Sequence, residues 1–275
     1  MLKRFVKFIC VVLCIAMLLP FTAVAEGNRE YCGKRPPDNQ PKTDHIDITD
    51  GSWYANNCRY VYYEGLMIGT SENEFSPHIE ITREMAVVIL IAIIKYQYNP
   101  YHESYLDDWN VPEYTYSSFK DVEVGKWYSD SIQWAYEHEL VAGIGDGYFG
   151  VGQPISREDF LVMLYNPIIK ASDSFKYEYR NGISEYQGEE DISEYARTAV
   201  GFFTNIVAYR YTMSLYFSLG DIPHIIEAYP DGLYHFKNTL TRAEAATMVA
   251  IYTHFEKGGY ALFNYPINVY KFING

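Results

Sequence analysis

Three apolar runs of helical length stand out along the chain, and each follows a short polar stretch that contains Ser or Thr and then Arg. These helix starts are Thr82-Arg83, Ser156-Arg157 and Thr241-Arg242. A Ser or Thr directly before such a run is typical of a helix N-cap, because its hydroxyl accepts a hydrogen bond from an amide of the first turn. The run from Arg83 to Ile94 is apolar on nearly every side, which predicts a helix buried at the centre of the core.

The residue three positions after each cap differs among the three copies. Glu244 completes a capping box with Thr241, Asp159 is a shorter version, and Met85 breaks the pattern. An arginine in the first turn lies at the positive end of the helix dipole, which costs a few tenths to about 1 kcal/mol. Its recurrence suggests an anion site made of the guanidinium and exposed helix-start amides, and the alternative is an ion pair with an acid of a neighbouring repeat.

The similarity between the copies extends well before the arginines. At a constant offset and without a gap, Asp47 matches Asp121, Trp53 matches Trp127, Leu66 matches Leu140, Gly69 matches Gly143 and Phe75 matches Phe149. The third copy has Tyr195-Ala196 in place of the tryptophan and Asp231-Gly232 in place of Asp146-Gly147. Repetition at this length predicts an all-α array of three helix–loop–helix units around one core.

The second copy reads Phe119-Lys120-Asp121-Val122, Trp127, Gly143, Asp146-Gly147 and Ser156-Arg157-Glu158, and the third contains Ile192 to Ala196 and Leu240-Thr241-Arg242-Ala243-Glu244. This order resembles the S-layer homology (SLH) repeat of bacterial surface proteins over about residues 45–256. The resemblance implies three repeats in a pseudo-threefold arrangement around a central three-helix bundle.

The resemblance also implies non-covalent attachment to the cell wall, by binding of pyruvylated secondary cell wall polysaccharide in grooves between adjacent repeats. The arginines would meet the pyruvate carboxylate, and the positions before them would line the sugar. The implied glycan-binding residues are Arg83, Arg157, Arg242, Trp53, Trp127, Tyr195, Asp47, Asp121, Gly69 and Gly143. No enzymatic activity, catalytic residue, metal or cofactor is implied. The alternative is a structural or partner-binding surface protein with degenerate glycan sites, whose insertion and tail contact another surface protein.

Two groups of implied site residues also have a structural interpretation. The aromatic residues Trp53, Trp127 and Tyr195 either anchor the core of each repeat or stack against a sugar ring. For Asp47 and Asp121 we favour capping of the following helix over hydrogen bonding to sugar hydroxyls. Seven scattered histidines show no ligand spacing, and the adjacent acids in the linkers are expected to be solvated charge rather than the paired carboxylates of a glycosidase.

The chain divides into a signal peptide (residues 1–25), a flexible leader (26–45), three repeats (46–94, 119–168 and 189–256), linkers (95–118 and 169–188) and a C-terminal tail (257–275). The first helix of repeat one is expected at about 53–66 with Gly69 as its stop, and Pro167 is expected to close the second helix of repeat two. Repeat three carries an insertion near 212–229, which is predicted to narrow the groove beside Arg242 and to leave that arginine a structural role.

Removal of the signal peptide removes three basic residues and no acid, so the net charge changes from −13 to −16. Such a chain is a poor candidate for nucleic-acid binding. No segment after the signal peptide is expected to span a membrane, so the protein is predicted to be secreted to the cell wall or S-layer. Cys32 and Cys58 either pair in this compartment, or Cys58 is a small buried residue.

Overall fold

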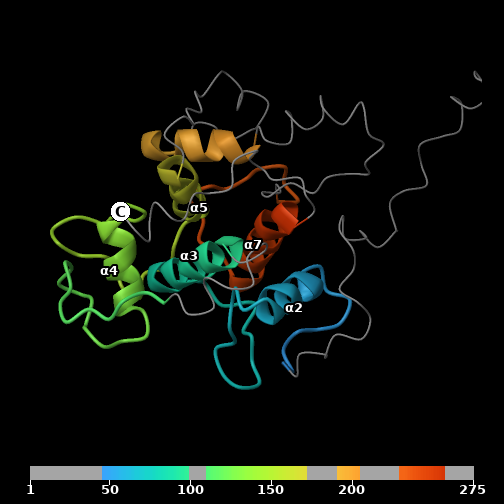
Figure 1. Ribbon diagram of the computed structural model, residues 1–275. Coiled ribbons are helices and arrows are strands. Elements are labelled where there is room, and N and C mark those ends of the chain that lie inside the picture. The colour runs from blue at the N-terminus through green and yellow to red at the C-terminus, as the bar shows by residue number, and fades with distance from the viewer. Residues whose placement is uncertain (1–44, 99–109, 172–190, 205–228, 258–275) are drawn as a thin grey trace, which may run out of the picture. The chain divides into compact units, whose positions relative to one another are not determined.

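The computed structural model describes residues 45–98, 110–171, 191–204 and 229–257 (Figure 1). All of the described residues belong to one unit, Asn39–Gly275. The predicted signal peptide, the leader up to residue 44, Cys32, the predicted insertion up to residue 228 and the tail beyond residue 257 lie outside the described residues.

The described part of the chain is helical and contains no strand, which confirms the all-α prediction. Its helices are α2 (Ala55–Tyr63), α3 (Arg83–Tyr98), α4 (Ser129–Glu137), α5 (Arg157–Ala171), the short 3-10 helix η3 (Glu194–Ala196) with helical residues 197–204 after it, and α7 (Arg242–Lys257). The helices predicted after Thr82, Ser156 and Thr241 each begin at the arginine. Within the described ranges, none of the helices has the length and apolar character needed to cross a membrane.

Each first helix lies against the second helix of a different predicted repeat. Helix α2 packs against α7, α4 packs against α3, and η3 packs against α5 (Figure 1). Helix α3 also contacts α5 and α7. Most of its apolar residues are buried, as the sequence predicted for a central helix: Ala86, Val87, Ile89, Leu90, Ile91, Ile93 and Ile94.

Backbone hydrogen bonds join the three helix starts in a closed circuit. Ile81 N donates to Leu240 O (2.9 Å), Leu240 N donates to Ile155 O (3.2 Å), and Ile155 N donates to Ile81 O (3.0 Å). The three side chains are fully buried. Antiparallel bridges flank the circuit and pair Glu80 with Thr241, Thr82 with Pro154 and Ser156 with Thr239. Each helix start is therefore held by backbone contacts with the other two.

The first helix of repeat one is shorter than predicted, and its stop is a different glycine. Helix α2 ends at Tyr63, and Gly65 follows its C-cap with a φ of 69°, a left-handed conformation that glycine adopts without strain. The prediction of Gly69 as the stop is wrong. A Cβ at Gly69 would lie 2.6 Å from Glu74 O, and one at Gly143 would lie 2.5 Å from Tyr148 O. Both glycines therefore permit a close approach of two backbone segments.

Two further sequence expectations concern Pro167 and Cys58. Pro167 does not end α5 but lies inside it, and the prediction of a helix end there is wrong. The neighbouring Ile168 is buried and Asn166 Nδ2 donates to Leu140 O (2.8 Å), so packing holds the helix together despite the missing amide. Cys58 carries a free, buried thiol, as one of the two interpretations predicted, and burial raises its pKa to about 12.

Candidate functional site: grooves at the helix starts

The three helix caps differ as their sequences predicted. Thr241 N donates to Glu244 Oε2 (2.8 Å) and Glu244 N donates to Thr241 Oγ1 (3.3 Å), which is the reciprocal capping box. At α5 the cap is one-sided, because Asp159 N donates to Ser156 Oγ (3.1 Å). At α3 the hydroxyl of Thr82 is buried and has no hydrogen-bond partner. The first helix start therefore has the weakest cap.

The first amides of α5 and α7 are already hydrogen-bonded. Arg157 N and Glu158 N donate to the carbonyls of Asn238 (2.9 Å) and Phe236 (3.0 Å). Arg242 N and Ala243 N donate to the carbonyls of Ile79 (2.9 Å) and Pro77 (2.8 Å). The prediction of an anion site with exposed amides is wrong for these two helices, because carbonyls from another predicted repeat take the place of the anion.

Arg242 and Arg83 hold the loop of the neighbouring predicted repeat in the same way. Arg242 Nε donates to Phe75 O (2.8 Å) and Nη2 donates to Ile68 O (2.5 Å), while the guanidinium carbon lies 4.8 Å from the Phe75 ring centre. Arg83 makes the equivalent contacts with Phe149 O (3.0 Å), Ala142 O (3.0 Å) and the Phe149 ring (5.1 Å). Each arginine thus fixes two carbonyls and one ring of a loop from a different repeat.

Two of the arginines also lie beside an acid in the first turn of another helix. This acid is the residue three positions after the helix cap. Arg157 Nη1 lies 3.3 Å from Glu244 Oε1 and donates to the hydroxyl of Tyr229 (3.1 Å). Arg83 Nη1 lies 3.7 Å from Asp159 Oδ2. The predicted alternative, an ion pair with an acid of a neighbouring repeat, is therefore found for these two arginines.

The two aspartates shape the loops that the arginines contact. Asp47 accepts hydrogen bonds from Phe75 N (2.9 Å) and Ser76 N (2.6 Å), and Asp121 accepts equivalent bonds from residues 149–151. The N-caps of α2 and α4 are Tyr54 and Tyr128, and neither helix has a side-chain cap. The favoured role of helix capping is wrong for both aspartates. Burial opposes ionisation of Asp121, but the backbone amides outweigh it and hold its pKa below the usual value.

The three aromatic residues at equivalent positions lie at the surface. Trp53 is 65% exposed, Trp127 61% and Tyr195 62%. In the first and third predicted repeats the following residue, Tyr54 or Ala196, is the buried one. These residues were predicted either to anchor the core of each repeat or to stack against a sugar ring. Their exposure does not fit a role as core anchors. Tyr195 also donates its hydroxyl to Asp159 Oδ1 (2.6 Å) at the start of α5.

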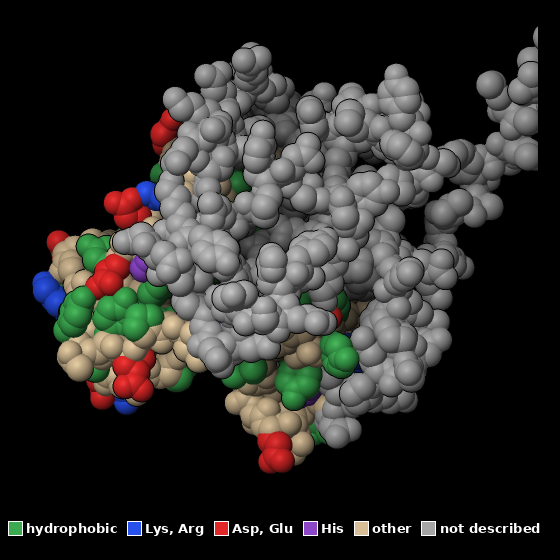
Figure 2. All heavy atoms as spheres, in the orientation of Figure 1, with side chains coloured by type: hydrophobic (Ala, Val, Ile, Leu, Met, Phe, Trp, Pro, Cys, Tyr) green, Lys and Arg blue, Asp and Glu red, His purple; other side chains and the backbone are tan. Residues whose placement is uncertain are grey.

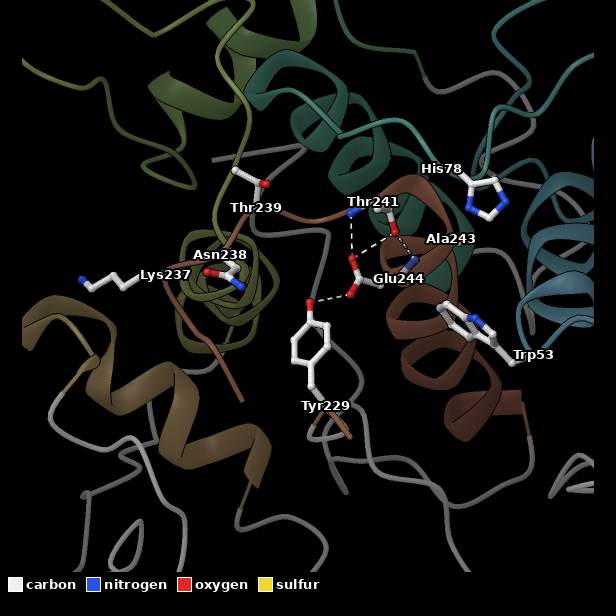
Figure 3. A pocket seen from close by; sticks show the side chains of 9 residues that line it. All are labelled: Trp53, His78, Tyr229, Lys237, Asn238, Thr239, Thr241, Ala243 and Glu244. Carbon is white, nitrogen blue, oxygen red and sulfur yellow. Dashed lines mark hydrogen bonds between the residues drawn. The ribbon is translucent and has the colours of Figure 1, made fainter. Parts of the chain in front are cut away.

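A groove with a volume of about 590 Å³ opens at the start of α7 (Figure 3). Trp53 and His78 line it from the first predicted repeat, and the third contributes Tyr229, Lys237, Asn238, Thr239, Thr241, Ala243 and Glu244. Glu244 lies between Thr241 and Tyr229, whose hydroxyl donates to it (2.6 Å) (Figure 3). Arg157 of the second repeat contacts both Glu244 and Tyr229, so residues of all three predicted repeats build this groove.

Several lining residues were not identified from the sequence. His78 and Lys237 each stand five residues before an arginine of the repeated motif, and this offset was the available signal. Lys237 Nζ is paired with the buried carboxylate of Glu158 (2.7 Å). Tyr229 is the last residue of the predicted insertion, where the alignment between repeats fails, so the sequence offered no signal for its place in the groove.

The sequence model of the S-layer homology domain matches residues 118–161. Residues 118–161 are an S-layer homology domain. This SLH domain contains α4, Trp127, Gly143 and the start of α5, and it coincides with most of the second predicted repeat. An SLH domain is a module for anchoring to the cell wall, so this match supports association of the chain with the cell wall.

Three curated proteins are similar to parts of the chain. An amylopullulanase of Thermoanaerobacterium thermosulfurigenes is 23% identical over 78% of this chain and 10% of its own length. An exoglucanase XynX of Acetivibrio thermocellus is 22% identical over 81% of this chain and 17% of its own length. An endoglucanase of Bacillus sp. (strain KSM-635) is 26% identical over 39% of this chain and 10% of its own length. The chain thus spans between about a tenth and a sixth of the length of these relatives.

Proposed function

We propose that the protein attaches non-covalently to the cell wall by binding pyruvylated secondary cell wall polysaccharide in grooves between adjacent SLH repeats. In this proposal residues 46–94, 119–168 and 189–256 are three repeats that close into one pseudo-threefold domain around α3, α5 and α7. The closed circuit of hydrogen bonds among Ile81, Ile155 and Leu240 supports the arrangement. The packing of each first helix against the second helix of another repeat supports it as well.

The observation that carries the proposal is the groove at the start of α7. Its volume is in the range of small-molecule sites, and it combines an exposed indole with hydroxyl, amide and carboxylate groups (Figure 3). An indole face offers an apolar surface to the C–H face of a sugar ring, and the polar groups of Asn238, Thr239 and Thr241 offer partners to its hydroxyls. Trp127 and Tyr195 share the exposure of Trp53, and in this proposal they line two equivalent grooves at the starts of α3 and α5.

The test is binding of the full chain to purified wall polysaccharide, before and after mild acid removal of the pyruvyl ketals. We expect the native polymer to bind and the stripped polymer to bind much more weakly. Trp53→Ala should lower the affinity about fivefold, because a stacked aromatic contact is worth on the order of 1 kcal/mol. Tyr63→Ala is the matched control, since Tyr63 is 54% exposed on the neighbouring α2 and does not line the groove.

A partner-binding function is the second candidate, and one surface feature favours it. Hydrophobic side chains gather at the surface of the SLH domain, over α4 and the adjoining loops (Figure 2). The exposed aromatic residues of this part of the chain are Tyr116, Trp127, Tyr136 and Tyr148. Clustered exposed aromatic residues are typical of interaction surfaces. Equal binding to native and stripped walls would favour this function over recognition of the pyruvyl group.

A further inference from the structure

In α5 and α7 the residue three positions after the helix cap forms an ion pair with an arginine from another predicted repeat. In α5 this residue is Asp159, which faces Arg83, and in α7 it is Glu244, which faces Arg157. The same position in α3 is Met85. Following the closed circuit of backbone contacts, the arginine that corresponds to Met85 is Arg242. By position, the counterpart of Asp159 and Glu244 for the third arginine is therefore a methionine, which carries no charge.

Arg242 is a buried cation that forms no ion pair within the described part of the chain. It is 5% exposed, and no carboxylate of the described residues lies within 4.0 Å of its guanidinium, whose observed acceptors are two neutral carbonyls. Asp47 favours its charge electrostatically, but this carboxylate already accepts the amides of Phe75 and Ser76. Burial lowers the pKa of Arg242, yet a guanidinium keeps its proton in proteins. A buried charge without a counter-charge is costly, so an anion supplied by a ligand would stabilise this site.

We propose that the residue at this third position sets the charge preference of each inter-repeat site. The α3 site, formed by Arg242, the start of α3 and Trp127, takes the carboxylate of the ligand. At the α5 and α7 sites, Asp159 and Glu244 neutralise the arginine from within the chain, so these sites take uncharged parts of the polymer. This inference rests on the proposed binding of a pyruvylated polysaccharide and assigns the anion to one of its three sites.

Met85 also explains the weak cap of α3, because its side chain cannot accept a hydrogen bond from the amide of Thr82 as Glu244 does from that of Thr241. The hydroxyl of Thr82 is buried without a partner, whereas Thr241 shares its cap with Glu244. A Glu or Gln at position 85 would complete the box with Thr82. The two substitutions differ in charge alone, because only the carboxylate would neutralise Arg242. Met85→Glu is therefore expected to raise stability and lower anion binding at once.

The experiment compares Met85→Glu with Met85→Gln in the full chain. The probes are purified wall polysaccharide and the same polymer after mild acid treatment, and the measured quantity is the ratio of the two affinities. Both variants should melt at or above the wild-type temperature. Met85→Gln should keep the wild-type ratio, whereas Met85→Glu should reduce it at least tenfold, toward equal binding of both polymers. If Met85→Glu does not fold, the comparison is repeated with Met85→Asp and with Met85→Asn as its control. Aspartate is the residue at the corresponding position of α5, Asp159.

Two outcomes would contradict the inference in different ways. If the acidic and amide variants keep the same ratio as the wild-type chain, the carboxylate does not bind at the α3 site, and the proposed function stands. If the wild-type chain itself binds both polymers equally, or binds neither, the proposed function fails and the inference fails with it.

Discussion

Replacement of Arg242 by methionine tests whether the arginine contacts hold the repeats together. Methionine keeps most of the aliphatic side chain beside the Phe75 ring and removes the donors to Phe75 O and Ile68 O. A hydrogen bond from a charged donor is worth about 1.5–3 kcal/mol, and the two carbonyls would be left without it. Allowing for the relief of a buried charge, we expect a net loss of about 2–3 kcal/mol. For a chain of this size that corresponds to a melting temperature lower by roughly 4–12 °C.

Thermal unfolding followed by circular dichroism measures this change, and Arg83→Met is the matched comparison. Arg83 makes the same carbonyl contacts, but its removal also leaves Asp159 without an ion pair, so its loss should be at least as large. The two variants should differ in their preference for the pyruvylated polymer over the stripped polymer. Arg242→Met should remove the preference for the pyruvylated polymer, while Arg83→Met should not. A shift below about 2 °C for Arg242→Met would mean that these contacts do not stabilise the fold, and the reasoning would then be wrong.

The remaining predictions concern single buried groups. His45→Phe should raise the melting temperature by about 2–4 °C, because both ring nitrogens of His45 are buried without a hydrogen-bond partner among the described residues. The corresponding residue of the second predicted repeat is Phe119, which packs against aromatic rings as His45 does. An unchanged or lower melting temperature would contradict this prediction. Asp121 has a lowered pKa in the folded state, so it contributes stability above the pKa of the unfolded chain and loses it as the pH falls through the folded value. Asp121→Asn should therefore be less stable than the wild type at neutral pH and differ from it less at acidic pH, as thermal melts at pH 7 and near pH 3 would show.

The positions of the main helices could be predicted because their signals are local. Caps and apolar runs placed the starts of α3, α5 and α7 at the correct residues. The partners of the helix-start amides could not be predicted in this way. The carbonyls that accept their hydrogen bonds, such as Ile79 O for Arg242 N, belong to loops of other predicted repeats. Only the folded arrangement of the repeats brings these carbonyls to the helix starts. The same reason applies to Asp47, whose amide partners at Phe75 and Ser76 are far along the sequence.

The arginines show how one sequence motif supports different roles in different repeats. All three are held by another repeat. Acids neutralise Arg83 and Arg157, whereas Arg242 has no ion pair among the described residues and the corresponding position is Met85. Three sites on one body that engage the same polymer strengthen each other's binding, provided that the polymer can reach them together. A single ionic contact would then supply the selectivity for the pyruvyl group, while stacking at Trp53 and Tyr195 would add affinity that hardly depends on salt. Raising the ionic strength should consequently weaken binding of the native polymer toward that of the stripped polymer and no further, because the uncharged contacts remain.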